Sequence, residues 1–200
     1  HTPRYKTVRW GKDLQVWFLE GRDYRSPNNM PDGPEKTILG DVQKAWLFIT
    51  LAGSVSRFKI ICSPAPVVGP ERANKEDAHA NVVFEHEGNE VRSRLAEIGG
   101  VIVLCGDRHW QYASFDEEAE LWEFGCGPGS EKHQFGWKAG DERPLHQFLR
   151  VKGGFLSGEL AYDDAEKAAL TIRHHKVTGE PVSEFCFQGD EVVRPQNALE

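Results

Sequence analysis

Asp107 and His109 are the two residues of this sequence whose types and spacing best suit chemistry. They follow an apolar run at residues 101–104 (VIVL), within the stretch LCGDRHWQ. The run predicts a buried strand, and if its pleat continues, residues two apart point the same way. A carboxylate and an imidazole together at a strand end suit a metal ion or acid–base chemistry. The alternative is structural, with Asp107 capping the next turn and His109 half-buried under Trp110.

Two further groups of polar residues are candidates for a site. Asp77 belongs to residues 75–81 (KEDAHAN), at the end of a proline-rich loop, and long loops in compact domains are often functional. A solvated polar loop is the alternative. Arg22 and Arg25 flank a tyrosine in an earlier polar loop. Their guanidinium groups suit phosphate or carboxylate, although arginines in loops are also common structural clamps.

Other polar residues favour structural roles. Glu87 lies at a predicted helix start, where a carboxylate complements the helix dipole. His174 and His175 are adjacent on a predicted strand, so their rings face opposite sides. The four cysteines are scattered without the paired spacing of a zinc module, which favours buried thiols.

The elements that must position these residues can be read from periodicity. Strand, helix, strand, long loop, helix and strand alternate up to about residue 110, which predicts an α/β layer with parallel strands. After that point the pattern indicates mostly antiparallel strands. The expected strands are 14–19, 58–62, 101–104, 112–115, 121–124, 148–151, 155–162, 169–175 and 182–187, and the expected helices are 38–52 and 87–98.

Composition limits the protein class. The 200 residues predict one domain, with an α/β part at about 1–110 and a β-rich part at 111–190. A net charge of −7 without a basic run argues against binding a nucleic-acid duplex. No apolar stretch approaches the ~20 residues of a membrane-spanning helix. The first ten residues carry no secretory signal.

Taken in order, several motifs resemble the PhoD-like alkaline phosphatases of the calcineurin-like metallophosphoesterase superfamily. The resemblance covers roughly residues 5–187. Glu20 stands where the family often has an aspartate, and Asp107 takes the place of the first histidine of the superfamily's Gly-His-x-His motif. The matching stretches are WFLEGRDYR (17–25), ILG (38–40) with Gln43 and WL (46–47), the strand and loop at 58–70, Asp77, and GDRHW (106–110).

The resemblance implies an α/β/β/α sandwich and metal-dependent hydrolysis of small phosphate mono- or diesters. It makes Asp107 and His109 metal ligands, Asp77 a weaker third, and Arg22 and Arg25 substrate-binding residues. Two metal ions are implied, with iron and calcium favoured, while oxygen and imidazole donors leave manganese, zinc and magnesium open. The resemblance also implies an exported protein. It does not indicate the oligomeric state.

The sequence departs from the family pattern in two places. Residues 77–81 (DAHAN) replace an Asp-x-Trp-Asp-Gly-Tyr stretch, and nothing in residues 1–16 supplies the ligands that the family carries on earlier strands. We therefore expect the C-terminal half of a catalytic domain, with a sandwich incomplete on its N-terminal side. Because metal affinity depends on ligand number, the chain by itself should be inactive. The alternative is a non-catalytic binding or interaction module that retains the fold.

Overall fold

The structure is a computed structural model that describes residues 3–188. The helices in this part of the chain are α1 (Asp41–Ala52) and α2 (Glu85–Ile98), with the short 3-10 helices η1 (Val82–Phe84) and η2 (Glu131–His133). The strands are β1 (Lys6–Trp10), β2 (Leu14–Phe18), β3 (Phe58–Ser63), β4 (Val101–Cys105), β5 (Gln111–Asp116), β6 (Leu121–Cys126), β7 (His146–Arg150), β8 (Gly154–Tyr162), β9 (Ala168–Lys176) and β10 (Pro181–Gln188).

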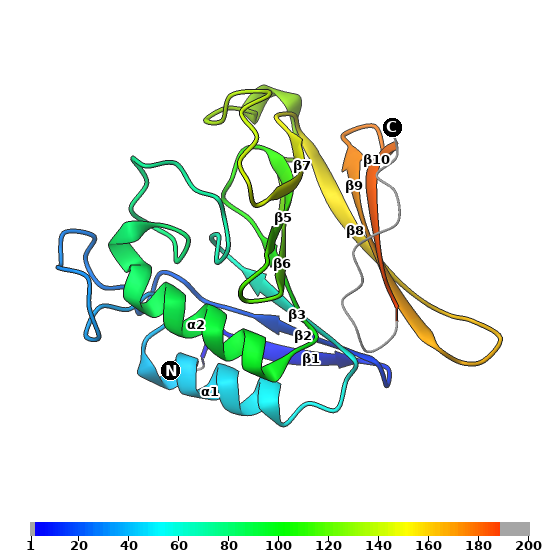
Figure 1. The fold of residues 1–200 in the computed structure, drawn as a ribbon, viewed down its shortest axis with the longest axis horizontal. Helices are drawn as coiled ribbons and strands as arrows, with labels where there is room; N and C mark the ends of the chain where they lie inside the picture. The colour runs from blue at the N-terminus through cyan, green and yellow to red at the C-terminus, as the bar shows by residue number, and fades with distance from the viewer. Residues whose placement is uncertain (1–2, 189–200) are drawn as a thin grey trace.

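The strands form two sheets (Figure 1). The larger has the order β1-β2-β3-β4-β6-β5-β7, and its centre, β2-β3-β4-β6, is parallel. Strands β1, β5 and β7 pair antiparallel with their neighbours at the two sides. The smaller sheet is an antiparallel meander in the order β10-β9-β8. The fold is therefore mixed α/β, with a parallel core and a separate antiparallel sheet.

Two hydrophobic cores lie on opposite faces of the large sheet. Val101 and Val103 of β4 pack with α1 and α2, while Ile102 faces the smaller sheet and packs with residues of β9 and β10. Each such buried aliphatic side chain stabilises the fold by about 1.5–3 kcal/mol. The layers are thus helix, sheet and sheet. Within residues 3–188, no second helical layer covers the outer face of the smaller sheet.

The observed elements follow the expected order with three differences. Strand β1 was not predicted, because its residues are mostly exposed and lack an apolar alternation. Helix α1 begins at Asp41 rather than 38, since Gly40 has a φ of 70°, which a helix does not allow. Strand β6 pairs antiparallel with β5 but parallel with β4, whereas mostly antiparallel strands were expected after residue 110.

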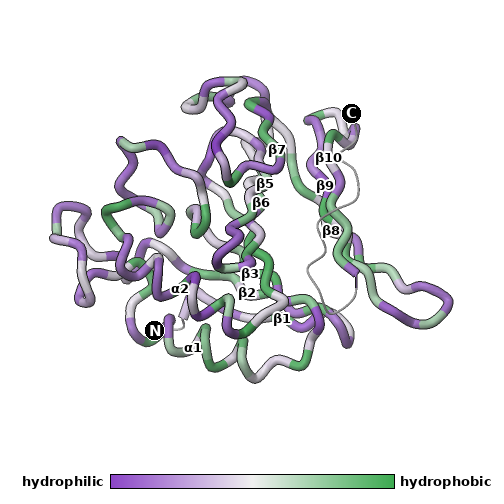
Figure 2. Tube along the Cα trace, viewed as in Figure 1, coloured by the Kyte–Doolittle hydropathy of each residue, from purple (hydrophilic) through white to green (hydrophobic). Residues whose placement is uncertain are grey.

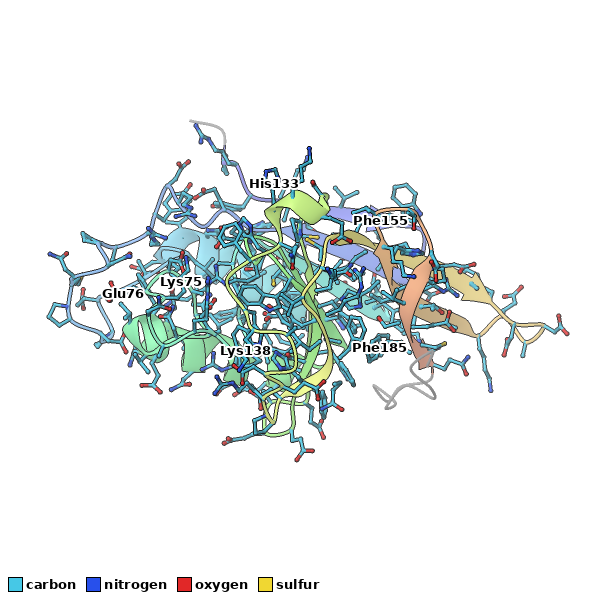
Figure 3. The ribbon with its side chains drawn as sticks, turned by 90° about the horizontal axis from the view of Figure 1, so that it is seen from above. Lys75, Glu76, His133, Lys138, Phe155 and Phe185 are labelled. Carbon is cyan, nitrogen blue, oxygen red and sulfur yellow. The ribbon has the colours of Figure 1, made fainter. Side chains whose placement is uncertain are left out.

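The parallel strands bring four loops to one edge of the large sheet. The segments that follow β2, β3, β4 and β6 all leave from the carboxyl ends of neighbouring strands, where sites in α/β sheets commonly form. These loops are largely hydrophilic (Figure 2). Lys75 and Glu76, from the loop after β3, lie at the end of the molecule opposite Phe155 and Phe185 of the smaller sheet (Figure 3).

The expectation of buried thiols is met only at Cys105. All four cysteines are free thiols, and Cys105 is buried while the other three are partly buried. Neither α-helix in the described residues is long and apolar enough to cross a membrane.

Candidate active site

Asp107 lies in a tight turn just after β4. The strand ends at Cys105, and the backbone of Asp107 has a φ of 63°. The Arg108 amide donates to the Gly106 carbonyl oxygen at 2.8 Å, which closes the turn. The pleat therefore stops before Asp107. The argument that placed Asp107 and His109 on one side of a continuing strand was wrong, because the chain turns there.

The turn sends neighbouring side chains into different environments. Asp107 is exposed and His109 is partly exposed, while Arg108 between them is buried. Aspartate tolerates a positive φ better than most residues, since its short side chain makes local polar contacts. The turn thus presents the two candidate ligands toward solvent and directs Arg108 inward.

Arg108 gathers three carboxylates from separate parts of the sequence. Its side chain is 1% exposed, and it forms ion pairs with Glu71 through Nε, with Asp77 through Nη2 at 3.1 Å, and with Asp107 through Nη1. Burial alone would lower the pKa of Arg108, but the three carboxylates raise it above its ordinary value. Asp77 and Asp107 therefore lie at the same guanidinium.

His109 is oriented by residues of the loop after β6. Its Nδ1 lies 2.6 Å from the carbonyl oxygen of His133, and its ring packs on Phe135 with centroids 4.0 Å apart. A carbonyl can only accept, so Nδ1 donates, and in the neutral imidazole this leaves the lone pair on Nε2. No hydrogen bond or ion pair between described residues occupies Nε2. The imidazole is therefore held in the tautomer that a metal ligand requires.

The loop that carries Asp77 is anchored by buried Glu123 and partly buried Arg92, neither of which the sequence pattern singled out. Glu123 of β6 accepts hydrogen bonds from the amides of residues 67–69 at 2.6, 3.0 and 2.9 Å, and from the Tyr112 hydroxyl at 2.8 Å. Arg92 of α2 donates to the carbonyl oxygens of Val67 and His79. A single acid inside the apolar run LWEFGC was the available signal for Glu123.

Arg22 and Arg25 reach the same region from the loop after β2. Its start is held by Glu20, whose carboxylate accepts the amides of Arg22 and Asp23 at 2.9 and 2.6 Å. Arg22, Arg25, Asp77 and His79 line one small recess, with room for little more than a water molecule. No hydrogen bond or ion pair among residues 3–188 joins either arginine to Asp107 or His109.

Glu87 lies in the first turn of α2 as expected, but it also has a role that its sequence position did not indicate. Its side chain is 1% exposed and bonds the Ile38 amide, the Thr37 hydroxyl and His79. Burial alone would raise its pKa, but the hydrogen bond and charge of His79, with the other two bonds, lower the pKa to about 2. Glu87 thus links α2 to the segments before α1 and after Asp77.

The predicted ligands fit a metal in type but supply only part of a site. Arg108 contacts Oδ1 of Asp77 and Oδ2 of Asp107, so each carboxylate keeps one oxygen without a partner in the described chain. These oxygens and Nε2 of His109 are suitable donors for iron, zinc, manganese or calcium. Across residues 3–188, however, no three His, Cys, Asp or Glu side chains are grouped closely enough to hold an ion.

The sequence matches the family of PhoD-like phosphatases over residues 1–151. The chain belongs to this family. No curated protein matches the sequence significantly. This PhoD-like chain shares its fold with a structure of PhoD, with a TM-score of 0.71 and 18% identity, over 97% of this chain and 43% of that one.

Two other solved structures share the fold of this PhoD-like chain. One is purple acid phosphatase PPD1 from yellow lupin (Lupinus luteus) seeds, with a TM-score of 0.60, 14% identity, and coverage of 91% of this chain and 32% of that one. The other is GAP50, the anchor in the inner membrane complex of Plasmodium, with a TM-score of 0.57, 12% identity, and coverage of 97% and 54%. The chain thus spans about half or less of each neighbour's length.

Proposed function

We propose that this chain is the C-terminal part of a metal-dependent phosphoesterase that hydrolyses small phosphate mono- or diesters. Its membership of a phosphatase family supports the reaction class. One observation of the site carries the proposal. Asp77 and Asp107 follow different parallel strands, yet each places one oxygen against Arg108 and keeps the other free. His109, two residues after Asp107, has an open Nε2.

In this proposal, Asp107 and His109 are metal ligands and Asp77 is a weaker third. Two bound metal ions would polarise the phosphoryl group and lower the pKa of a water molecule that attacks it. The carbonyl of His133 and the ring of Phe135 fix the direction of the His109 lone pair. Arg22 and Arg25 have no carboxylate partner in the described residues, which leaves their guanidinium groups available for phosphoryl oxygens.

We further propose that the remaining ligands come from outside this chain. The described residues group no three metal-binding side chains, and the chain spans 43% of the PhoD structure that it resembles. Iron with calcium stays the favoured pair by family resemblance. An isolated chain that supplies two or three ligands would hold a metal weakly and turn over ester negligibly, because affinity and positioning depend on the complete ligand set.

A second candidate is a non-catalytic interaction module. One fold neighbour, GAP50, is described as an anchor rather than as an enzyme, so the fold also occurs where anchoring is the stated role. The incomplete group of metal-binding side chains in the described residues is consistent with this alternative. It predicts no turnover in any longer protein that contains the chain, whichever metal is supplied.

The test compares His109→Ala with His86→Ala, an exposed histidine on α2 whose amide hydrogen bond in the described chain goes to Asp32 and not to a proposed ligand. Each variant is made in the 200-residue chain and in the longest protein that contains it, and is assayed on aryl phosphate mono- and diesters with iron, calcium, manganese or zinc. We expect turnover only in the longer protein. His109→Ala should lower the turnover more than about 100-fold, since loss of a group that merely hydrogen-bonds to a metal ligand already costs about 10–100-fold.

The outcomes separate the two candidates. Turnover that survives His109→Ala contradicts the ligand role, and a longer protein without turnover under any metal supports the interaction module. Robust hydrolysis by the isolated chain that disappears in His109→Ala would show that the chain holds a complete site, and the proposal of external ligands would be wrong.

A further inference from the structure

Arg108 is buried beside the proposed ligands without being one of them. It lies between Asp107 and His109 in the sequence, but its side chain is 1% exposed and turns inward. A buried guanidinium is costly unless its donors are paired with carboxylates of good geometry. Its two terminal nitrogens donate hydrogen bonds to Asp107 and Asp77, while Nε forms a close ion pair with Glu71 without hydrogen-bond geometry.

The three carboxylates around Arg108 range from buried to partly exposed. Glu71, on Nε, has a side chain that is 1% exposed, whereas Asp77 and Asp107, on the two terminal nitrogens, are 19% and 35% exposed. Glu71 therefore secures the inner end of the guanidinium. The outer end faces the two carboxylates that open toward solvent.

The planar fork of an arginine fixes the relative geometry of the groups that it pairs. Asp77 and Asp107 come from loops after different strands, and no hydrogen bond between described residues joins them directly. Their shared contact is Arg108, which takes one oxygen from each and leaves one free. Glu71 also lies 3.4 Å from Nε of Arg72, so the three carboxylates meet two guanidinium groups in this cluster.

We propose that Arg108 is a positioning residue that presents the free oxygens of Asp77 and Asp107 to the same metal site. This inference rests on the proposed function. It requires that the ordering of the two carboxylates by Arg108 favours metal binding more than the positive charge of Arg108 opposes it. A positive guanidinium next to a cation site opposes binding by simple electrostatics, so the residue helps only because it orders the two carboxylates.

Arg92 is a matched control for this role. It also anchors the loop of Asp77, through the carbonyl oxygens of Val67 and His79 and the side chain of Asn89, yet none of its hydrogen bonds goes to a carboxylate. Substitution of Arg92 or Arg108 by Lys or Gln removes a guanidinium group that holds the loop of Asp77. Only the changes at Arg108 release the carboxylates of Asp77 and Asp107.

The experiment titrates Mn²⁺ into the ¹⁵N-labelled chain and follows paramagnetic broadening of the amides of Asp77 and Asp107, a readout that detects weak binding and needs no activity. In the unmodified chain, both amides should broaden at the same Mn²⁺ concentration. Arg108→Lys and Arg108→Gln should each raise that concentration at least about tenfold. The amides of Asp77 and Asp107 should then broaden at different Mn²⁺ concentrations. Arg92→Lys and Arg92→Gln should change it less than about threefold, with melting temperatures recorded for all four variants.

Arg108→Gln decides between geometry and charge. If the guanidinium acts only as a nearby positive charge, its removal tightens Mn²⁺ binding, and the proposal is overturned. Equal losses in the Arg92 and Arg108 variants would also overturn it, because the role would then be loop folding alone. If neither amide broadens on addition of Mn²⁺, in the unmodified chain or in a longer protein, the proposed function itself is contradicted. If Mn²⁺ binds with the same affinity in the Arg108 variants as in the unmodified chain, only the positioning role is contradicted.

Discussion

At the scale of single residues, backbone conformation decides how the candidate ligands are presented. The φ of 63° at Asp107 places a turn where the sequence indicated more strand, and this turn separates exposed Asp107 from buried Arg108. His109 then receives its orientation from His133 and Phe135, which lie in the loop after β6. Neither contact follows from the motif GDRHW taken by itself.

A pair of substitutions at Asp107 tests the backbone contribution separately from the carboxylate. Asp107→Gly and Asp107→Ala both remove the ion pair with Arg108, but only alanine keeps a Cβ at a positive φ. We expect the glycine variant to be more stable by roughly 0.5–1 kcal/mol, because the left-handed strain of alanine exceeds the extra chain entropy of glycine. Urea unfolding of both variants measures the difference, and an alanine variant as stable as the glycine variant would contradict the turn.

At the scale of elements, buried and partly buried charged side chains hold loops to the sheet and helices. Glu123 of β6 and Arg92 of α2 hold the loop after β3, and Glu87 of α2 holds the segment before α1. Each side chain satisfies backbone groups that would otherwise be buried without partners, at a cost of about 1–3 kcal/mol apiece. The loops at the candidate site are therefore fixed by the same layers that form the core.

Glu87 predicts a specific dependence of stability on pH. Folding lowers its pKa from 4.5 to about 2, so it stabilises the native state above about pH 4.5, and this contribution is lost as the pH falls through 2. The shift corresponds to a free energy of unfolding on the order of 3 kcal/mol. Glu87→Gln should lower stability at pH 7 by a similar order and flatten its decline between pH 4.5 and 2.

The control for this prediction is Glu90→Gln on the same helix, where the side chain is 45% exposed and pairs only with Lys44. Exposed ion pairs contribute about 0–1 kcal/mol, so this variant should keep the pH profile of the unmodified chain. Denaturant unfolding at several pH values gives both profiles. Parallel profiles for Glu87→Gln and the unmodified chain would show that Glu87 is not the group responsible.

At the scale of the whole molecule, one side of the large sheet is incompletely covered. Strand β1 is an edge strand, and Val8, Trp10 and Phe18 on β1 and β2 are 41%, 70% and 38% exposed. Leu14 and Val16, which pair with Trp10 and Val8, pack against the core beneath the smaller sheet. An apolar surface thus continues outward from that core to an open edge, which favours association.

We expect the isolated 200-residue chain to self-associate through this edge. Trp10→Lys should shift the population toward monomer, because it removes the most exposed aromatic side chain and places a charge on the edge strand. Val55→Lys, at a residue 81% exposed in the loop after α1, is the control and should leave association unchanged. Sedimentation velocity at several concentrations measures the effect, and a chain that stays monomeric throughout would contradict the prediction.

The sequence alone determined the order of most elements and the loops that carry the candidate residues. Apolar periodicity is a local property, so β2, β3, β4 and both helices could be predicted from short windows. The motifs around Arg22, Asp77 and Asp107 likewise indicated the PhoD-like phosphatase family, which the match over residues 1–151 confirms. Strand β1 escaped prediction because an exposed edge strand needs no apolar alternation.

Only the tertiary structure decided which charges are buried together. Glu123 meets the amide of Val68 across 55 residues of sequence, and Arg108 meets Asp77 across 31, and no local pattern indicates such partners. The sequence placed Glu87 at a helix start, but whether that position faces solvent depends on the segment that packs over it. Burial of a charge is set by neighbours distant in sequence, because the free energy of desolvation is offset only by groups that folding brings within hydrogen-bond distance.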